Sequence, residues 1–195
     1  MESMIKIELA KKEQATIIAS LIMEAMNYDC CQWFIGLDNT LDSFHKLLSR
    51  LVESDNSLYS YHNTLVAVNE DGDVVGICVC YDGAKVKELR KSFEIEMLQT
   101  YEKDYSHLPY ETKAGEFYID SLCVHQEWRK KGIASQLLNV AKEKANGLHL
   151  PASLLVDTSN SKAEALYIRL GFKYDSKTKW GGHSMKRLIY VNGEK

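Results

Sequence analysis

The chain has 195 residues, 45% hydrophobic and 26% charged, a composition typical of one globular domain. Its net charge of −3 at pH 7 gives no overall reason to expect nucleic acid or a membrane surface as a partner. No apolar run is long enough to span a bilayer, and the start of the chain lacks a secretory signal pattern. The five cysteines form no CxxC pair, which favours free thiols in a reducing compartment. We therefore expect a single cytoplasmic domain over residues 1–195.

The first part of the chain combines strand and helix patterns. Apolar residues alternate with polar ones near the start, which predicts a strand, and two later stretches repeat at helical spacing. Two β-branched runs on either side of an Asp-Gly turn predict a hairpin. The expected strands are about 5–9, 65–68 and 74–81, and the expected helices are about 12–26 and 41–54.

A charged segment of about 83–115 follows the hairpin. Apolar residues at helical spacing predict a helix from about Lys85, and Pro109 ends any continuing pattern. Basic residues come first in the segment and acidic residues follow. It is either a solvated helix or a lid or wall over a substrate site. Among the upstream aromatic side chains, Trp33 and Phe34 are expected in the core rather than in a pocket or a dimer surface.

A long strand is expected next, from about 116 to 124. Side chains of a strand alternate between its two faces, so polar-headed residues at every second position share one face. Three such residues in a row are unusual for a purely structural central strand. We interpret this face as chemically active. By alternation it carries Glu116, Tyr118, Asp120, Leu122 and Val124.

A short basic turn with a glycine links this strand to an amphipathic helix over about 133–146. Backbone N–H groups at a helix N-terminus, the helix dipole and the side chains of Arg129, Lys130 and Lys131 all favour an anion. Gly132 removes a side chain where the backbone would approach a ligand. Taken alone, the turn suits a nucleotide, a sulfate or a flavin phosphate.

The last part of the chain repeats the order strand, turn, helix. A strand pattern precedes a short helix that Gly171 closes as a C-cap, and two further strands follow. This order predicts an α/β sandwich around a mixed sheet. The expected strands are about 154–156, 172–174 and 185–191, and the expected helix is about 163–170.

Two motifs, each opening a helix, begin about thirty residues apart. Residues 129–134 match Arg/Gln-x-x-Gly-x-Gly/Ala, and residues 160–172 match Asn-x-x-Ala-x-x-Leu-Tyr-x-x-x-Gly-Phe. Together they resemble the signatures of the GNAT family of N-acetyltransferases, and the order of elements over 4–191 is similar too. The resemblance implies an α/β (α+β) fold with a mixed, mostly antiparallel central sheet flanked by helices. The segment 83–115 would be a helical insertion between strands three and four.

The resemblance also implies a site for acetyl-coenzyme A as co-substrate. In this family the first motif holds the pyrophosphate, and the preceding strand pairs with the pantetheine arm as an added strand would. The family usually has a bulge there, and an N–H group at Leu122 or Cys123 would polarise the thioester carbonyl. The side chain of Cys123 is expected in packing and not as a nucleophile. The implied coenzyme-binding residues are Leu122, Cys123, Val124, Arg129, Lys130, Lys131, Gly132, Ile133, Ala134, Asn160 and Tyr167.

Acetyl transfer to an amine needs a proton acceptor and a proton donor, since an alkylammonium has a pKa of about 10.4. Asp120 is the first candidate for the base, and Glu116 and Tyr118 on the same face could replace it or orient the amine. Asp120 could instead be a structural carboxylate. Tyr167 matches the family's general acid, which protonates the leaving thiolate, although a core tyrosine is the alternative.

These features imply direct transfer of acetyl from acetyl-coenzyme A to a primary amine, with a small molecule as the expected acceptor. Two alternatives remain: a coenzyme-sensing module that turns over weakly or not at all, and an N-acetyltransferase acting on proteins or peptides. The six histidines show no ligand spacing, so no metal site is expected. Dimers are common in the family, so a homodimer is among the expected states.

Overall fold

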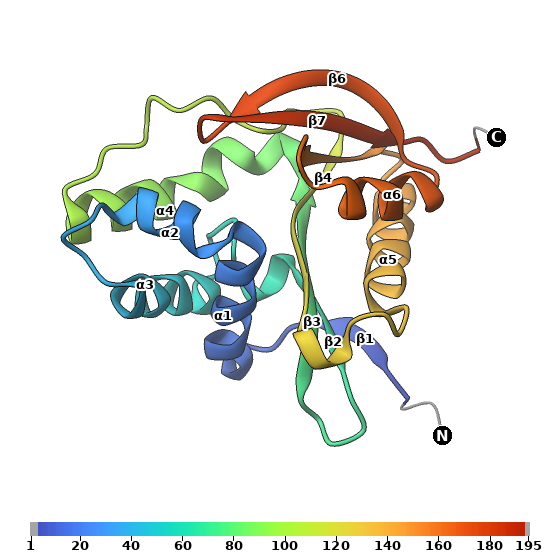
Figure 1. The fold of residues 1–195 in the computed structure, drawn as a ribbon, viewed down its shortest axis with the longest axis horizontal. Helices are drawn as coiled ribbons and strands as arrows, with labels where there is room; N and C mark the ends of the chain where they lie inside the picture. Colours follow the sequence, from blue (N-terminus) through green and yellow to red (C-terminus); the bar gives the residue numbers. More distant parts are fainter. Residues whose placement is uncertain (1–3, 194–195) are drawn as a thin grey trace.

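The computed structural model describes residues 4–193 and is built around one seven-stranded sheet (Figure 1). The strand order is β1-β2-β3-β4-β5-β7-β6, and β4 and β5 are the only parallel neighbours in the described chain. The strands are β1 (Lys6–Leu9), β2 (Thr64–Val68), β3 (Val74–Asp82), β4 (Phe117–Val124), β5 (Ala152–Asp157), β6 (Lys173–Trp180) and β7 (His183–Tyr190). This mixed, mostly antiparallel sheet confirms the predicted fold class.

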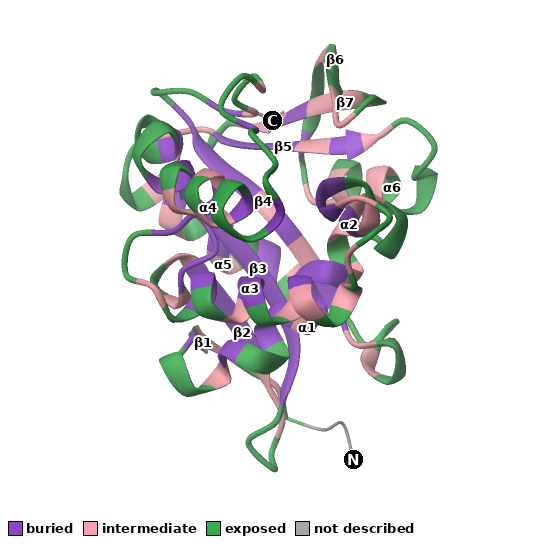
Figure 2. Cartoon of the chain, turned by 90° about the vertical axis from the view of Figure 1, so that its left-hand side faces the viewer, coloured by how far each residue is buried: buried purple, intermediate pink, exposed green. Residues whose placement is uncertain are grey.

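Helices cover both faces of the sheet (Figure 1). The α1–α4 side and the α5–α6 side each have their own apolar core, and the central strands lie buried between them (Figure 2). The helices are α1 (Ala15–Met26), α2 (Tyr28–Ile35), α3 (Leu41–Glu53), α4 (Val86–Tyr101), α5 (Ile133–Gly147) and α6 (Ser161–Arg169). Short 3₁₀ turns span Lys12–Gln14, Tyr61–Asn63, Gly83–Lys85 and Gln126–Trp128. Within residues 4–193, no helix is long and apolar enough to cross a membrane.

The insertion lies where the sequence predicted it, since α4 and a long loop connect β3 to β4. Two local predictions were wrong. Trp33 packs against Phe34 and Tyr105, with ring centroids 5.0 and 5.7 Å away, yet 50% of its surface is exposed. Strand β6 continues well past Tyr174, because pairing with β7 stabilises a polar stretch that carries no apolar alternation.

A β-bulge in β4 reverses the side-chain alternation on which one sequence prediction depended. Ser121 pairs with Val79 and Ile119 pairs with Cys80, so Asp120 is the extra residue and has no partner in β3. The bulge itself was expected from the family resemblance.

The consequence is that the five residues predicted to share one face are divided between two. Tyr118 lies in the α1–α4 core, and Cys123, which follows the bulge, lies in the same core. Leu122 packs with the opposite core, on the α5 side, and Val124 is part of that core. The prediction of one shared face was therefore wrong, because strict alternation holds only without an extra residue.

The parallel pair of β4 and β5 opens into a gap. The two strands pair from Phe117 with Ala152 to Ile119 with Leu154, and the register ends there although both strands continue. Beyond the bulge, the edge of β4 that faces β5 is therefore left for another partner.

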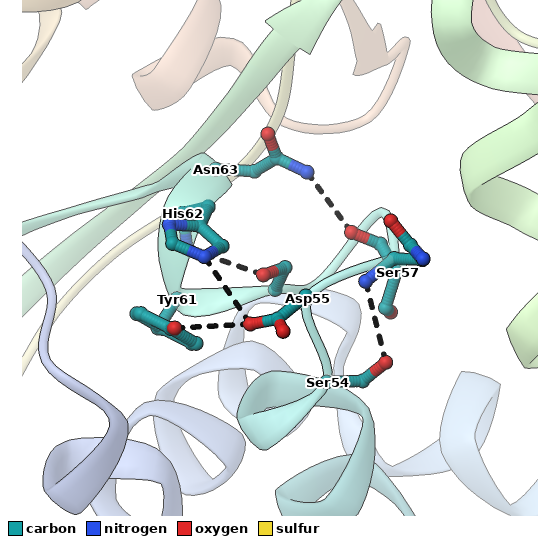
Figure 3. A network of polar contacts seen from close by, with 8 residues as sticks. Ser54, Asp55, Ser57, Tyr61, His62 and Asn63 are labelled. Atoms are coloured by element: carbon teal, nitrogen blue, oxygen red, sulfur yellow. Dashed lines mark hydrogen bonds and ion pairs between the residues drawn. The ribbon is translucent and has the colours of Figure 1, made fainter.

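A polar network fixes the loop that joins α3 to β2 (Figure 3). The Asp55 carboxylate accepts a hydrogen bond from the Tyr61 hydroxyl at 3.0 Å and lies 3.2 Å from Nε2 of His62. The side-chain amide of Asn63 donates to the Ser57 carbonyl at 2.9 Å. These contacts, together with an N–H···O bond to α4, hold the loop segment that carries Leu58 and Tyr59 inward.

Candidate active site

A cleft of about 750 Å³ lies along β4, beside its gap with β5. It has two parts, which lie toward the two faces of the sheet. The α5 half is lined by Leu122, Val124, Lys130, Gly132, Ile133, Ala134, Asn160 and Tyr167. The insertion half is lined by Phe34, Leu58, Tyr59, Arg90, Phe93, Leu108, Glu111, Tyr118 and Asp120.

The α5 half contains a helix N-terminus whose N–H groups have no capping side chain. The caps of α2, α3 and α6 are Asn27, Thr40 and Asn160, each of which accepts a bond from the first turn, whereas Gly132 of α5 offers no side chain. Lys130 and Gly132 both have left-handed backbone, with φ of 63° and 78°. Such turns direct successive N–H groups into one concavity, which is a site for a phosphate oxygen.

The basic side chains of this turn have different roles. The Nε atom of Arg129 donates to the Val124 carbonyl at 3.0 Å, and its guanidinium pairs with Glu24 of α1. The ammonium of Lys131 lies 4.3 Å from the ring centre of Trp128, and this side chain does not line the cleft. Arg129 therefore fixes the turn to β4, and Lys130 is the lysine of the turn that lines the cleft.

Backbone directions in β4 show which groups face the gap. Backbone N–H and C=O groups of successive strand residues point to opposite edges. The N–H of His125 donates to the Val75 carbonyl of β3. The backbone N–H and C=O groups of Val124 and Leu122, one and three residues earlier, therefore point away from β3. The bond from Arg129 to Val124 agrees with this direction. Of the two N–H donors considered from the sequence, Leu122 thus faces the gap and Cys123 faces β3.

Cys123 itself is buried in the α1–α4 core and lines the cleft. Burial raises the pKa of its thiol to about 12, so the thiol stays protonated at neutral pH. A protonated, buried thiol is a poor nucleophile, which agrees with a packing role.

Tyr167 of α6 carries its phenol into the α5 half. Its ring packs edge-on against Phe172, with centroids 5.9 Å apart, and among the described residues its hydroxyl makes no hydrogen bond. Burial raises its pKa well above the ordinary value, so it keeps its proton. Asn160 also lines the cleft, but its side-chain oxygen accepts the Ala163 N–H as the cap of α6. Its amide nitrogen is the donor left for a ligand.

Asp120 stands at the bulge, in the insertion half. The Tyr81 hydroxyl donates to one carboxylate oxygen at 3.0 Å and the Ser121 hydroxyl donates to the other at 2.9 Å. Burial raises the pKa of Asp120, while these two bonds oppose the rise. The position combines a fixed carboxylate with access to the cleft.

Glu111 is a second cleft carboxylate, which the sequence analysis missed as a site residue. It belongs to the loop after α4 and lines the insertion half. Burial, and then the charge of Asp120, raise its pKa to about 8. The sequence could not single out Glu111, because it is one of several acidic residues in a charged segment. Only the fold brings it near Asp120.

Glu116 was predicted as a candidate base, and the structure does not bring it to the cleft. It is buried, accepts hydrogen bonds from the Thr112 hydroxyl at 2.7 Å and the Lys113 N–H at 3.0 Å, and pairs with Arg187 of β7. These contacts identify a structural carboxylate that ties the insertion loop to β7.

Tyr118 does reach the insertion half, with its ring 5.9 Å from that of Tyr81. Burial, followed by the charges of Glu111 and Asp120, raises its pKa well above the ordinary value. It therefore keeps its proton and suits orientation of a ligand better than proton abstraction.

Comparisons with known proteins agree with this geometry. The acetyltransferase (GNAT) family model matches residues 23–172. A crystal structure described as an acetyltransferase is 26% identical, with a TM-score of 0.78, over 95% of this chain and 98% of that chain. An N-acetyltransferase from Staphylococcus aureus Mu50 is 25% identical, with a TM-score of 0.80, over 94% and 99% of the two chains.

A further likeness shows the fold alone: the NatC complex bound to Gag peptide and CoA is 19% identical, with a TM-score of 0.56, over 98% of this chain and 99% of that chain. No match was found among curated proteins. The family model covers most of the chain, and each of the three structures named above covers at least 94% of it. The chain therefore belongs to the GNAT family of acetyltransferases, whose co-substrate is acetyl-coenzyme A.

Proposed function

We propose that the protein is an N-acetyltransferase that transfers acetyl directly from acetyl-coenzyme A to the primary amine of a small molecule. The observation that carries this proposal is the composition of one cleft. An uncapped helix N-terminus and the phenol of Tyr167 lie in its α5 half, and the half-buried carboxylates of Glu111 and Asp120 lie in its insertion half. Anion binding, proton donation and proton acceptance are the three tasks that this reaction needs.

The α5 half suits the coenzyme. The pyrophosphate of the coenzyme would accept hydrogen bonds from the backbone N–H groups of residues 130–134, at the start of α5. The ammonium of Lys130 would attract its negative charge. The pantetheine arm would occupy the gap beside β4 in the manner of an added strand. The N–H of Leu122 would then donate to the thioester oxygen, where negative charge develops in the transition state.

The insertion half suits the amine. A primary amine is an ammonium at neutral pH and must lose a proton before it can attack. Glu111 or Asp120 would take that proton. The pKa of both is raised, and that of Glu111, at about 8, lies near neutral pH, which suits a general base.

The neutral nitrogen would then form a bond to the thioester carbon. The tetrahedral intermediate would expel the thiolate of the coenzyme, and the Tyr167 hydroxyl would donate a proton to that sulfur. The nitrogen would lose its second proton to solvent as the amide forms, and the phenolate of Tyr167 would regain one proton from solvent. The products are an amide, a free thiol and one proton released from the original ammonium.

The test has two measurements on the purified protein. Calorimetry should show binding of acetyl-coenzyme A, and a colorimetric thiol assay should show release of coenzyme A when primary amines are added. Mass spectrometry of the amine should show the gain of one acetyl group. No coenzyme binding at millimolar concentration would exclude the proposal. Binding without thiol release for any class of amine would indicate a coenzyme-sensing module instead.

A further inference from the structure

The charges of the insertion half distinguish it from the α5 half. Of the nine lining residues named above for the insertion half, two are carboxylates, Glu111 and Asp120, and one, Arg90, is cationic. Arg90 is only 3% exposed, and its nitrogens are occupied: Nη1 by the Pro109 carbonyl at 2.9 Å and Nη2 by the Tyr105 carbonyl at 3.2 Å. Its Nε atom lies 3.2 Å from a carboxylate oxygen of Glu94 on the same helix. These contacts hold the guanidinium in the wall of the cleft, where its charge favours ionisation of Glu111 and Asp120.

The remaining walls of the insertion half are aromatic and aliphatic. The rings of Phe34 and Tyr59 both pack edge-on against Phe93 of α4, with centroids 5.6 and 6.1 Å apart. All three side chains are buried, and Leu58 and Leu108 extend the same surface. Apart from the two carboxylates, the phenols and Arg90, the side chains named for this half are apolar.

At the rim of the insertion half, Arg90 contacts both the insertion loop and the β6–β7 hairpin. The guanidinium of Arg90 lies 5.1 Å from the ring centre of Tyr110 in the insertion loop and 5.4 Å from that of Trp180, at the tip of the β6–β7 hairpin. Figure 1 shows this hairpin extending over the sheet toward the insertion. The two contacts bring the hairpin and the insertion loop to the same guanidinium, which favours a compact occupant over an extended chain.

We propose, on the basis of the function proposed above, that the acceptor is a compact primary amine with one ammonium group, an apolar and preferably aromatic body, and no carboxylate or phosphate group. The ammonium is attracted by the two carboxylates and by aromatic faces. A second anionic group close to the amine would lie against Glu111 and Asp120, whose charges Arg90 already partly balances, and like-charge contact of this kind disfavours binding. Because the charge of Asp120 disfavours ionisation of Glu111, the pair balances one ammonium better than two.

A matched panel of acceptors tests this inference on the wild-type protein. We would compare kcat/KM for 2-phenylethylamine, phenylalanine, spermidine and a short peptide with a free N-terminus. Phenylalanine differs from 2-phenylethylamine only by a carboxylate, so the preference for the amine should be at least about 100-fold. The inference is overturned if phenylalanine, spermidine or the peptide equals or exceeds 2-phenylethylamine.

Charge reversal provides a second readout. Glu111→Lys should reduce the preference for 2-phenylethylamine over phenylalanine by at least about tenfold, because the new ammonium can balance the carboxylate. Glu88→Lys, on the exposed surface of the same insertion, should leave the preference unchanged. Equal preferences in both variants would contradict the electrostatic argument.

The two levels of the proposal fail differently. Rapid turnover of acetyl-coenzyme A with carboxylated amines overturns this inference alone. The absence of thiol release with every amine overturns the proposed function, and this inference with it.

Discussion

Replacing Glu111 by glutamine tests the role assigned to the residue that the sequence analysis missed. The substitution keeps the size and most hydrogen-bonding capacity of the side chain but removes its charge and its proton. If Glu111 takes the proton from the amine, the wild-type rate should rise with pH as this carboxyl ionises, with a midpoint near its pKa of about 8. At pH 6 the rate should be about 100-fold below its plateau, since only about 1% of the carboxyl is ionised there.

The variant should lose this dependence. General-base catalysis contributes about 10²- to 10⁴-fold, so Glu111→Gln should lower the plateau rate by an amount in that range. Asp120→Asn should act differently, because removing its negative charge removes one cause of the raised pKa of Glu111. The midpoint of the pH–rate curve should then move to lower pH.

The raised pKa of Glu111 also predicts that the wild type and Glu111→Gln differ in unfolding free energy by an amount that depends on pH. The Glu111 carboxyl has its pKa raised from 4.5 to about 8, so its ionised form is disfavoured in the folded state. Relative to Glu111→Gln, the wild-type free energy of unfolding should fall as the pH rises from 4.5 through 8. At 1.36 kcal/mol per pH unit, the total loss is at most about 5 kcal/mol.

The assays are thiol release at saturating coenzyme between pH 6 and 9.5, and urea unfolding at pH 5.5, 7 and 9. Glu88→Gln, at an exposed position of α4, serves as the control and should follow the wild-type curves. If the pH–rate curve of Glu111→Gln superimposes on that of the wild type, Glu111 is not the base. If the stability difference does not change with pH, the carboxyl is not buried as described.

Three further substitutions give independent tests. Tyr167→Phe should lower kcat by about 10²-fold or more with little change in coenzyme affinity by calorimetry, and an unchanged kcat would remove its role as acid. Glu116→Gln weakens the buried pair with Arg187 and should cost up to about 3–5 kcal/mol in urea unfolding while the folded enzyme keeps its pH–rate midpoint. Gly132→Ala places a side chain at a φ of 78° and should cost about 1–2 kcal/mol and weaken coenzyme binding. Gly147→Ala, at an unstrained position with open space around it, is the matched control and should do neither.

The elements with strong local patterns were predicted well. The hairpin of β2 and β3, helix α3 and helix α5 each follow from periodicity or turn chemistry that a few neighbouring residues carry. Strand β6 and the exposure of Trp33 were predicted wrongly, because pairing with the following strand β7 decides the first and packing decides the second.

The candidate site likewise has one part that could be predicted from the sequence and one part that could not. The basic turn 129–132 and the helix that follows could be identified from the sequence, because the N–H groups, the glycine and the charges are contiguous. The division of roles among the acidic residues could not be predicted. Asp120 and Glu116 have equivalent positions in an alternating strand, yet Asp120 faces the cleft and Glu116 pairs with Arg187.

The sequence by itself determined the family and the order of elements, and it predicted a candidate anion site, because these depend on residues close together in the chain. The tertiary structure decided which carboxylates share the cleft. Glu111 reaches it from a loop whose path is set by its ties to β7, and Asp120 reaches it at the bulge of β4. Long-range contacts and one extra residue in a strand govern both outcomes, and neither leaves a periodic signal in the sequence.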